Sequence, residues 1–154
     1  MLDFSKPNAE GIAEIAANLR RLDVIELEAT GYTDMEYALS NSVAKSTFSY
    51  LVYDSYGRPL GAFGCGPLGT LSSGRGSPWF VGTDFLDKHR VAMVRYGKRY
   101  VQEFSKAYPV MLNMVHRENT PSIRWLKHIG FKLNPPTPAG VRGELFHVFH
   151  MGVA

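Results

Sequence analysis

The sequence predicts a mixed α/β (α+β) fold in which helices cover one sheet, and three observations support this prediction. Segments with helical spacing of apolar residues alternate along the chain with short apolar segments typical of strands. Residues 1–46 have a mainly helical pattern, whereas strands begin near Thr47. The chain has 154 residues, 45% of them hydrophobic, which suffices for one core but not for two. We therefore expect residues 1–154 to form one domain, with a helical part at 1–46 and a sheet with a long helix at 47–154.

Three helices are expected in the first part of the chain. The first begins at Asn8, whose side chain suits a helix start, and apolar residues follow it at helical spacing. The second covers 21–29 and ends before Gly31, because glycine favours the end of a helix. Thr33 resembles a cap for a third, short helix over 34–42.

A hairpin and a loop are expected next. Residues 48–53 and 60–65 are apolar or alternating segments on either side of the turn residues 54–59, which predicts a β-hairpin. Residues 64–78 are rich in glycine and have no hydrophobic period, so we expect a loop. Residues 79–82 then read as a short apolar strand that ends at a glycine.

The rest of the chain is expected to alternate between helices and strands. A long helix over 85–108 has an apolar face, with a basic face opposite that includes Arg95 and Arg99. Pro109 ends this helix. The remaining segments are expected to be a strand at 110–115, a helix at 119–129, a strand at 131–133, a loop at 134–143 and a closing strand at 144–151.

Charge and cysteine content narrow the classes of function. Residues 1–41 carry eight acids against three bases, a net charge of −5, and residues 42–154 carry fourteen bases against six acids, a net charge of +8. A basic body of this kind attracts phosphates, of nucleotides or of nucleic acid. A lone cysteine, Cys65, excludes an internal disulfide and fits a reducing compartment. Because we find no long apolar span and no signal-peptide pattern, we expect the protein to be neither inserted in a membrane nor exported.

The most informative segment is 115–131, which reads VHRENTPSIRWLKHIGF. Its pattern resembles the last cofactor-contacting segment of the Gcn5-related N-acetyltransferase (GNAT) superfamily, V-x-x-x-N-x-x-A followed by a hydrophobic residue and a closing Gly-Phe. The matching residues are Val115, Asn119, Ser122 in place of alanine, Ile123, Gly130 and Phe131. The segment follows a strand, a long helix and a strand in the order that this superfamily uses. The resemblance covers residues 47–150, and residues 1–46 fit the two leading helices loosely.

This resemblance implies a particular sheet. It would be a mixed, mostly antiparallel sheet of six to seven strands, covered by about four helices. Its central pair of parallel strands, 79–82 and 111–115, would splay apart and open a slot toward the amino end of the long helix. A narrower similarity links WFVGTD at 79–84, the basic helix and the segment from Asn119 to the small internal virion protein family of podophages. That family implies a bacteriophage protein in the host cytoplasm or the virion, with other virion proteins as partners.

The superfamily also implies acetyl-CoA as a cofactor. Its pantetheine arm would pair with the first splayed strand, and its pyrophosphate would lie at the start of the long helix. By resemblance, the cofactor-binding residues are Val81, Gly82, Thr83, Lys88, His89, Arg90, Asn119 and Ser122. Asn119 is also expected to cap the helix that follows it. No metal is expected, because His147 and His150 fall on opposite faces of one strand.

The sequence departs from the superfamily pattern at three places. The glycine-rich loop that cradles pyrophosphate is replaced by 87–92, where Lys88, His89 and Arg90 offer side-chain cations instead, unless they are only solvated charges. Leu126 stands where relatives carry a tyrosine that protonates the leaving thiolate. The central strands also lack the glutamate that serves as a base. His116 and Asp84 are candidate catalytic substitutes, His116 because its pKa suits a base.

Two functions from different classes follow from these observations. The first is an acyl-CoA-binding N-acetyltransferase-like protein, a transferase with a degenerate active site, which acts on an unknown amine or host protein. The alternative is a non-catalytic internal virion or morphogenesis protein that retains the fold, since a fold does not imply a function. Binding of DNA by the basic body is a third, less favoured function, which predicts a steep salt dependence.

Overall fold

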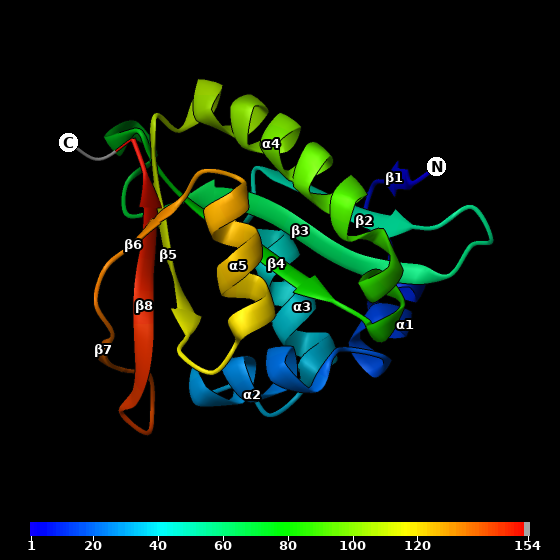
Figure 1. The fold of residues 1–154 in the computed structure, drawn as a ribbon, viewed down its shortest axis with the longest axis horizontal. Coiled ribbons are helices and arrows are strands. Elements are labelled where there is room, and N and C mark those ends of the chain that lie inside the picture. The colour runs from blue at the N-terminus through cyan, green and yellow to red at the C-terminus, as the bar shows by residue number, and fades with distance from the viewer. Residues whose placement is uncertain (153–154) are drawn as a thin grey trace.

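Eight strands form one mixed sheet in the computed structural model, which describes residues 1–152 (Figure 1). Their order is β1-β2-β3-β4-β5-β8-β6, with β7 paired to β8. The strands are β1 (Asp3–Ser5), β2 (Phe48–Tyr53), β3 (Pro59–Pro67), β4 (Arg75–Gly82), β5 (Val110–His116), β6 (Lys132–Leu133), β7 (Thr137–Ala139) and β8 (Glu144–Met151). All pairings are antiparallel except that of β4 with β5. This confirms the predicted mixed, mostly antiparallel sheet with a central parallel pair.

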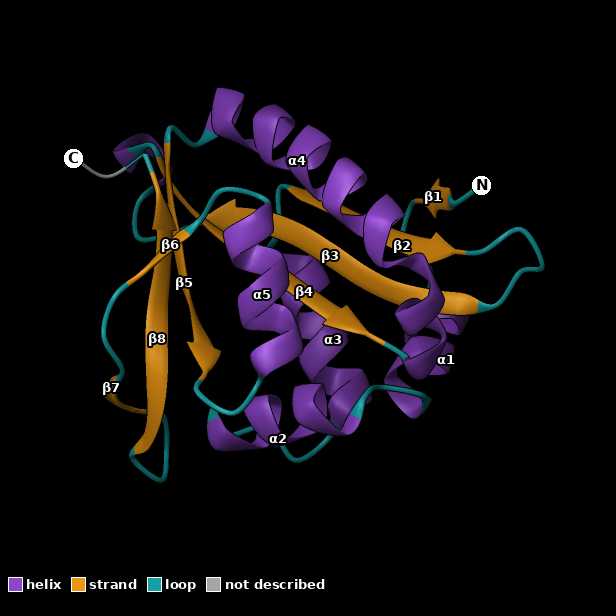
Figure 2. Cartoon of the chain, in the orientation of Figure 1, coloured by secondary structure: helices purple, strands orange, loops and turns teal. Residues whose placement is uncertain are grey.

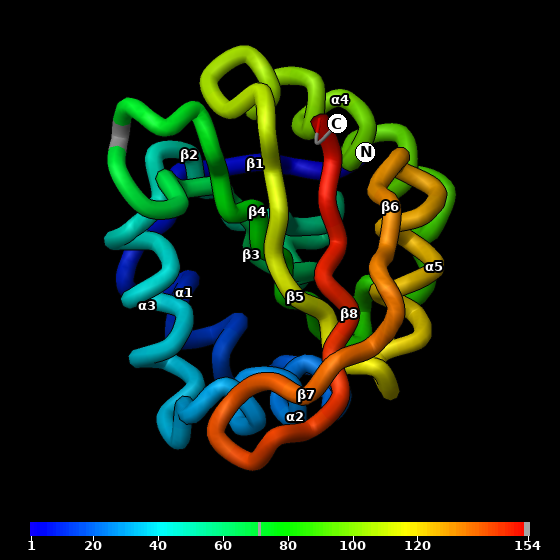
Figure 3. Tube along the Cα trace, turned by 90° about the vertical axis from the view of Figure 1, so that its left-hand side faces the viewer, coloured from blue at the N-terminus to red at the C-terminus, as the bar shows by residue number. Residues whose placement is uncertain are grey.

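Five α-helices cover the two faces of the sheet (Figure 2). They are α1 (Ala9–Ala17), α2 (Arg21–Ala29), α3 (Met35–Lys45), α4 (Arg90–Ala107) and α5 (Thr120–His128). Two short 3₁₀ helices, η1 (Leu71–Ser73) and η2 (Asp84–His89), follow β3 and β4. Helices α4 and α5 lie on one face of the sheet, and α1, α2 and α3 lie on the other (Figure 3). The described residues therefore contain the five helices that the residue pattern predicts, where the resemblance implied about four, and eight strands where it implied six to seven.

The alternation of side chains along the strands supplies the core on each face. On β2 and β3, Leu51 and Ala62 point to the side of α1 and α3, whereas Val52 and Phe63 point to the side of α4. The cluster facing α4 and α5 is rich in aromatic residues and also contains Cys65. Burial raises the pKa of the Cys65 thiol to about 12, so this cysteine is an inert part of the core.

Several boundaries differ from the sequence prediction. Most of 64–78 is strand rather than loop, because β3 continues to Pro67 and β4 begins at Arg75. Glycine is needed in this part of the sheet because neighbouring groups are very close: a Cβ on Gly76 would lie 2.6 Å from the Tyr108 ring. Gly64, Gly66 and Gly76 therefore mark close packing between strands and their neighbours, whereas Gly69 and Gly74 have positive φ in the connection between β3 and β4.

The helix boundaries and two short strands also needed correction. Asp34, not Thr33, caps α3, since its side chain accepts a hydrogen bond from the Tyr37 N–H at 3.1 Å. Helix α4 begins at Arg90, after η2, and not at 85. Strands β1 and β7 were missed because three residues give too little pattern for a periodicity to be recognised. Among residues 1–152, no helix has both the length and the apolar character that a membrane span requires.

Candidate functional site

The parallel strands β4 and β5 pair only at their beginnings and then separate. Their register contains two pairs, Arg75 with Val110 and Gly76 with Met111. Beyond these pairs, β5 continues to pair with β8, and β4 continues to pair with β3. The predicted splay between 79–82 and 111–115 is therefore present, and it exposes unpaired backbone on both strands.

Asn113 of β5 bridges the beginning of this splay. Its Nδ2 donates a hydrogen bond to the Pro78 carbonyl oxygen on β4 at 2.8 Å. Its Oδ1 accepts a hydrogen bond from the Met114 N–H at 2.8 Å. One side-chain amide thus satisfies a backbone group on each strand, in place of the missing ladder bonds.

The backbone of β4 beyond this bridge points into the splay. The Thr83 N–H donates to the Leu60 carbonyl oxygen at 2.9 Å, which fixes which β4 groups face β3. By the antiparallel alternation, the N–H and C=O of Phe80 and Gly82 then face β5. The Gly82 pair is already used, since its N–H donates to Asp23 Oδ2 at 2.8 Å and its carbonyl accepts from the Arg20 N–H at 2.9 Å. The Phe80 peptide groups face the cavity described next.

A cavity of about 300 Å³ lies beside the splay, between the sheet and helices α2 and α3. Its walls include strand residues 78–81 and 113–115. Its polar lining groups are Asp23, Glu26, Thr30, Tyr32, Ser42, Asn113 and Ser122. Two carboxyl groups and no Lys or Arg therefore line a mostly apolar cavity, which suits a ligand with a positively charged or hydrogen-bond-donating group.

Glu26 of α2 is the lining residue with the chemistry of a general base. Its Oε2 accepts hydrogen bonds from the His116 N–H and from Asn119 Nδ2, each at 3.0 Å. The Glu26 residue as a whole is only partly buried, but its carboxyl group is surrounded by protein. This burial raises the pKa of Glu26, and its effect outweighs that of the two hydrogen bonds, which lower the pKa. A raised pKa makes the carboxylate a better proton acceptor near neutral pH.

Asp23 and Arg20 close the far end of the splay. Asp23 is 3% exposed, and its carboxylate accepts hydrogen bonds from Arg20 Nε at 3.0 Å and from Asn119 Nδ2 at 3.2 Å, besides the bond from Gly82. The Arg20 guanidinium also donates to Ser122 Oγ at 3.4 Å. We call Arg20, Asp23 and Ser122 the clasp. They connect the beginning of α2 to the last residue of β4 and to the first turn of α5.

Asn119 occupies the N-cap position of α5, directly before Thr120, where the sequence predicted it. It is 2% exposed, and its side chain makes no capping bond, so this part of the prediction is wrong. The amide nitrogen donates to Asp23 and Glu26 instead. Among the described residues, Asn119 Oδ1 is a buried polar atom with no hydrogen-bond partner. Such an orphaned acceptor is costly and indicates a place for a donor from a ligand.

His116 does not reach the cavity. Its Nδ1 lies 3.1 Å from the Glu118 N–H, which can only donate, so Nδ1 accepts and Nε2 carries the hydrogen that is donated to Glu144 at 2.8 Å. Because both ring nitrogens are engaged, no lone pair is free to take a proton from a substrate. This hydrogen bond from His116, helped by Arg142, lowers the pKa of Glu144. The base role expected of His116 belongs more naturally to Glu26.

The other predicted residues fall into two groups. Val81 and Ser122 line the cavity. Gly82 is the last residue of β4 and Thr83 follows it, and the N–H groups of both already donate hydrogen bonds within the protein. Asp84 is exposed in η2 and does not line the cavity, so the structure does not bring this candidate catalytic residue to the site. Lys88 and His89 end η2, and Arg90 begins α4. Among residues 1–152, no group of three His, Cys, Asp or Glu side chains could hold a metal ion.

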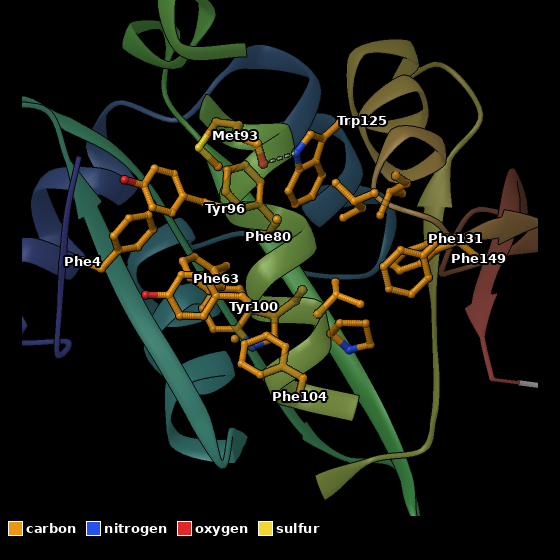
Figure 4. Close-up of a pocket in the computed structure, with 17 residues that line it drawn as sticks. Phe4, Phe63, Phe80, Met93, Tyr96, Tyr100, Phe104, Trp125, Phe131 and Phe149 are labelled. Atoms are coloured by element: carbon orange, nitrogen blue, oxygen red, sulfur yellow. Dashed lines mark hydrogen bonds between the residues drawn. The ribbon is translucent and has the colours of Figure 1, made fainter. Parts of the chain in front are cut away.

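Trp125 covers the opposite side of the splay (Figure 4). Its indole N–H donates to the Met93 carbonyl oxygen at 3.0 Å, and its ring centroid lies 4.9 Å from that of Phe80. Gly97 permits this contact between α5 and α4, since a Cβ there would lie 3.0 Å from the indole. Only an apolar cavity of about 60 Å³, lined largely by aromatic rings, remains beneath α4 and α5. Side chains of the chain itself therefore fill much of the space between these helices.

Sequence patterns do not point directly to Arg20, Asp23 and Glu26 as site residues. They lie three residues apart, so they share one face of a helix, and charged residues with this spacing read as a solvated face. The one available signal is the weak amphipathic pattern of α2, since a helix without a distinct polar face can turn charged residues inward. Only the packing of α2 against the splay turns this face inward.

Comparisons with known proteins support the fold. No protein-family model matches the chain, and no curated protein matches its sequence. Among solved structures, the chain is similar to the spermidine N-acetyltransferase from Vibrio cholerae in complex with CoA and spermine, with a TM-score of 0.72, 9% identity, and coverage of 97% of this chain and 94% of that one. It is also similar to a GCN5-related N-acetyltransferase from Kribbella flavida (TM-score 0.69, 14% identity, 99% and 98% coverage) and to a GNAT-family acetyltransferase from Bacillus anthracis (0.69, 12%, 97% and 93%).

The chain has the GNAT fold. This confirms the fold that the motif around Asn119 implied, including the splayed parallel pair. The similarity to the podophage family is not supported by these comparisons and stays a hypothesis.

The raised pKa of Glu26 predicts a pH dependence of stability. Because the folded-state pKa lies above the ordinary value of 4.5, the folded protein holds a proton that the unfolded chain releases. This contribution to stability is complete below pH 4.5 and is lost as pH rises through the folded-state pKa. We expect Glu26→Gln to remove this loss of stability with rising pH. The free energy of unfolding, measured by urea unfolding between pH 4 and 8, would test this. Glu28→Gln, at an exposed position of the same helix, is the control; parallel stability curves for wild type and Glu26→Gln would contradict the prediction.

Proposed function

We propose that the protein is an acetyl-CoA-binding N-acetyltransferase-like protein that acts on an amine and has a degenerate donor site. The observation that carries this proposal is the position of the Glu26 carboxyl group in the wall of a cavity that adjoins the β4–β5 splay. A fold similarity alone would not support it, because one fold serves many functions.

The acceptor half of the site retains the chemistry that amide formation needs. A protonated amine must lose a proton before its nitrogen can attack a thioester, and a nearby carboxylate of raised pKa can accept that proton. Glu26 supplies this carboxylate, whereas the charge of Asp23 is already balanced by its ion pair with Arg20. The Vibrio cholerae structure holds spermine, a polyamine, together with CoA. An acceptor with a primary amine fits the Glu26 carboxylate best.

The donor half of the site fits only part of the cofactor. The Phe80 peptide groups face the cavity and are free to pair with the amides of a pantetheine arm. Within the described part of the chain, Asn119 Oδ1 is a second acceptor without a partner, although Asn119 is buried and does not line the cavity. The phosphates would depend on the side chains of Lys88, His89 and Arg90, because the Gly82 and Thr83 amides are already bonded. Acetyl-CoA, when bound, supplies the acetyl group that the amine receives.

The donor half also explains why we describe the site as degenerate. Leu126 is buried at the position where the resemblance implies an acidic tyrosine, so no proton donor stands there for a leaving thiolate. The clasp closes the far end of the splay and Trp125 packs over its other side, which leaves less room beside β4 for a cofactor. We therefore expect slow transfer and modest cofactor affinity.

Isothermal titration with acetyl-CoA tests the binding step. We expect a dissociation constant in the micromolar range, weakened about tenfold when Lys88 and Arg90 are both replaced by Gln, because charge-assisted bonds to phosphate are lost. Lys45→Gln, an exposed position on α3, should leave the affinity unchanged. The absence of any heat of binding at millimolar acetyl-CoA would contradict the proposal.

Substitution of Glu26 tests the chemical step. Glu26→Gln keeps an oxygen that can accept the His116 and Asn119 hydrogen bonds, but it cannot take up a proton from an amine. We expect a 10²- to 10⁴-fold decrease in the rate of acetyl transfer to spermine or a similar polyamine, about the magnitude for loss of a general base. Glu28→Gln should retain the wild-type rate. An unchanged rate for Glu26→Gln would show that the base lies elsewhere.

Trp125 and the clasp fill part of the donor side, and this observation favours a second candidate function. If Trp125 and the clasp keep acetyl-CoA out, the chain is a non-catalytic protein that uses the fold for assembly. The similarity of 79–84 and of the segment after Asn119 to podophage internal virion proteins supports a role in phage morphogenesis, in the host cytoplasm or the virion, with other virion proteins as partners. The titration above distinguishes the two, because this candidate predicts no binding at millimolar acetyl-CoA.

A further inference from the structure

The outer surface of α4 and α5 carries a dense group of exposed positive charges. We define this basic face by the residues Lys88, Arg90, Arg95, Lys98, Arg99, Arg124, Lys127 and Lys132, all of which are exposed. Helices α4 and α5, which carry most of these cations, lie on the same face of the sheet (Figures 1 and 3). Because these cations are exposed, they lie on the outer surface of this helical layer. Net charge concentrated in this way attracts a polyanion.

The charges of the basic face are not neutralised within the chain. Within residues 1–152, none of its eight members forms an ion pair, and the only ion pair on α4 joins Lys106 to Glu103. Like charges at this density repel one another and destabilise the folded state. A surface that keeps such repulsion without internal compensation is suited to an external negative partner.

The opposite side of the molecule is acidic. Helices α1, α2 and α3 and their flanking residues expose Glu10, Glu14, Glu28, Asp34 and Glu36. These helices lie on the other face of the sheet from α4 and α5. The molecule is therefore polarised across the sheet, and a polyanion would meet it with α4 and α5 foremost.

Three cations of α4 and two of α5 lie on neighbouring helices. Arg95, Lys98 and Arg99 follow one stripe of α4. From Arg95 to Arg99 the helix rises about 6 Å at 1.5 Å per residue, so these side chains can reach neighbouring phosphates of one duplex, and together with the cations of α5 they can neutralise about five phosphates. Arg124 and Lys127 of α5 flank this stripe, because Trp125 holds α5 against α4.

The surface lacks the features that recognise single strands. Single-stranded nucleic acid is bound through aromatic side chains on which the bases stack. The exposed large apolar residues of the chain include no aromatic residue of α4 or α5, where the rings face the core instead. Backbone contact with a duplex needs only positioned cations.

We propose that the basic face binds double-stranded DNA through its phosphates, without sequence preference. The basic face shares Lys88 and Arg90 with the proposed donor site, but the activity is tested separately, since Arg95, Lys98, Arg99, Arg124 and Lys127 have no part in the proposed donor or acceptor site. A failure of either proposal therefore leaves the other intact.

The experiment is a fluorescence-anisotropy titration of a labelled 20-base-pair duplex at 50, 100 and 200 mM NaCl. With about five phosphates neutralised, the slope of log K against log salt should be about −4.5. This slope corresponds to an affinity loss of about 500-fold between the lowest and highest salt. Replacing Arg95, Lys98 and Arg99 by Gln should make the slope shallower by about 2.7, and replacing Arg124 and Lys127 by Gln should make it shallower by about 1.8.

A matched control distinguishes DNA binding by a defined surface from an effect of the net charge of the protein. Replacing Lys6, Arg21 and Lys45 by Gln removes the same charge from exposed positions away from the basic face and should leave the slope unchanged. Circular dichroism would check that each variant is folded. Equal losses in the control and the α4 variant would overturn the proposal. It would also be overturned by the absence of binding at 50 mM NaCl, or by displacement of the duplex by poly-glutamate as readily as by unlabelled DNA, which would indicate an acidic protein partner.

Discussion

Parallel strands that stop pairing leave backbone groups without partners, and the rest of the site depends on how these groups are satisfied. Between β4 and β5, the side chains of Asn113 and Asp23 take the place of a ladder, at Pro78 and Gly82 respectively. On the β5 side, Glu26 accepts the His116 N–H. A buried unpaired N–H or C=O would cost free energy. The acids that line the cavity thus have a structural role before they have any chemical one.

This double role of the two acids explains why the acceptor side and the donor side of the site differ. Glu26 is fixed by two hydrogen bonds and faces a cavity, which provides an oriented carboxylate on the acceptor side. Asp23 bonds to the Gly82 N–H, which removes that amide from the donor side. In the function proposed above, α2 therefore positions the carboxylate of the acceptor side and removes one backbone amide from the donor side. A weak donor side and an ordered acceptor side would then have one physical cause.

The sequence predicted the fold more completely than the site. The motif around Asn119 implied the fold, and the separation of 79–82 from 111–115 followed from it. The sequence could not predict that Asp23 and Glu26 are the acids of the site, because charged residues on a short helix usually face solvent. It also could not predict that Glu144 would engage His116, because only the pairing of β5 with β8 brings them together. Local patterns determine elements, whereas packing between distant elements determines which polar groups are buried.

The central claim is that the unpaired backbone of β4 in the splay receives the pantetheine arm of a CoA thioester. Two-dimensional ¹H–¹⁵N NMR of the labelled full-length protein during titration with CoA tests it most directly. We predict saturable shifts of the Phe80 amide and of the Asn119 side-chain amide, at the same CoA concentrations. Shifts confined to the exposed cations of α4 and α5, with Phe80 and Asn119 unmoved at saturating CoA, would contradict the account.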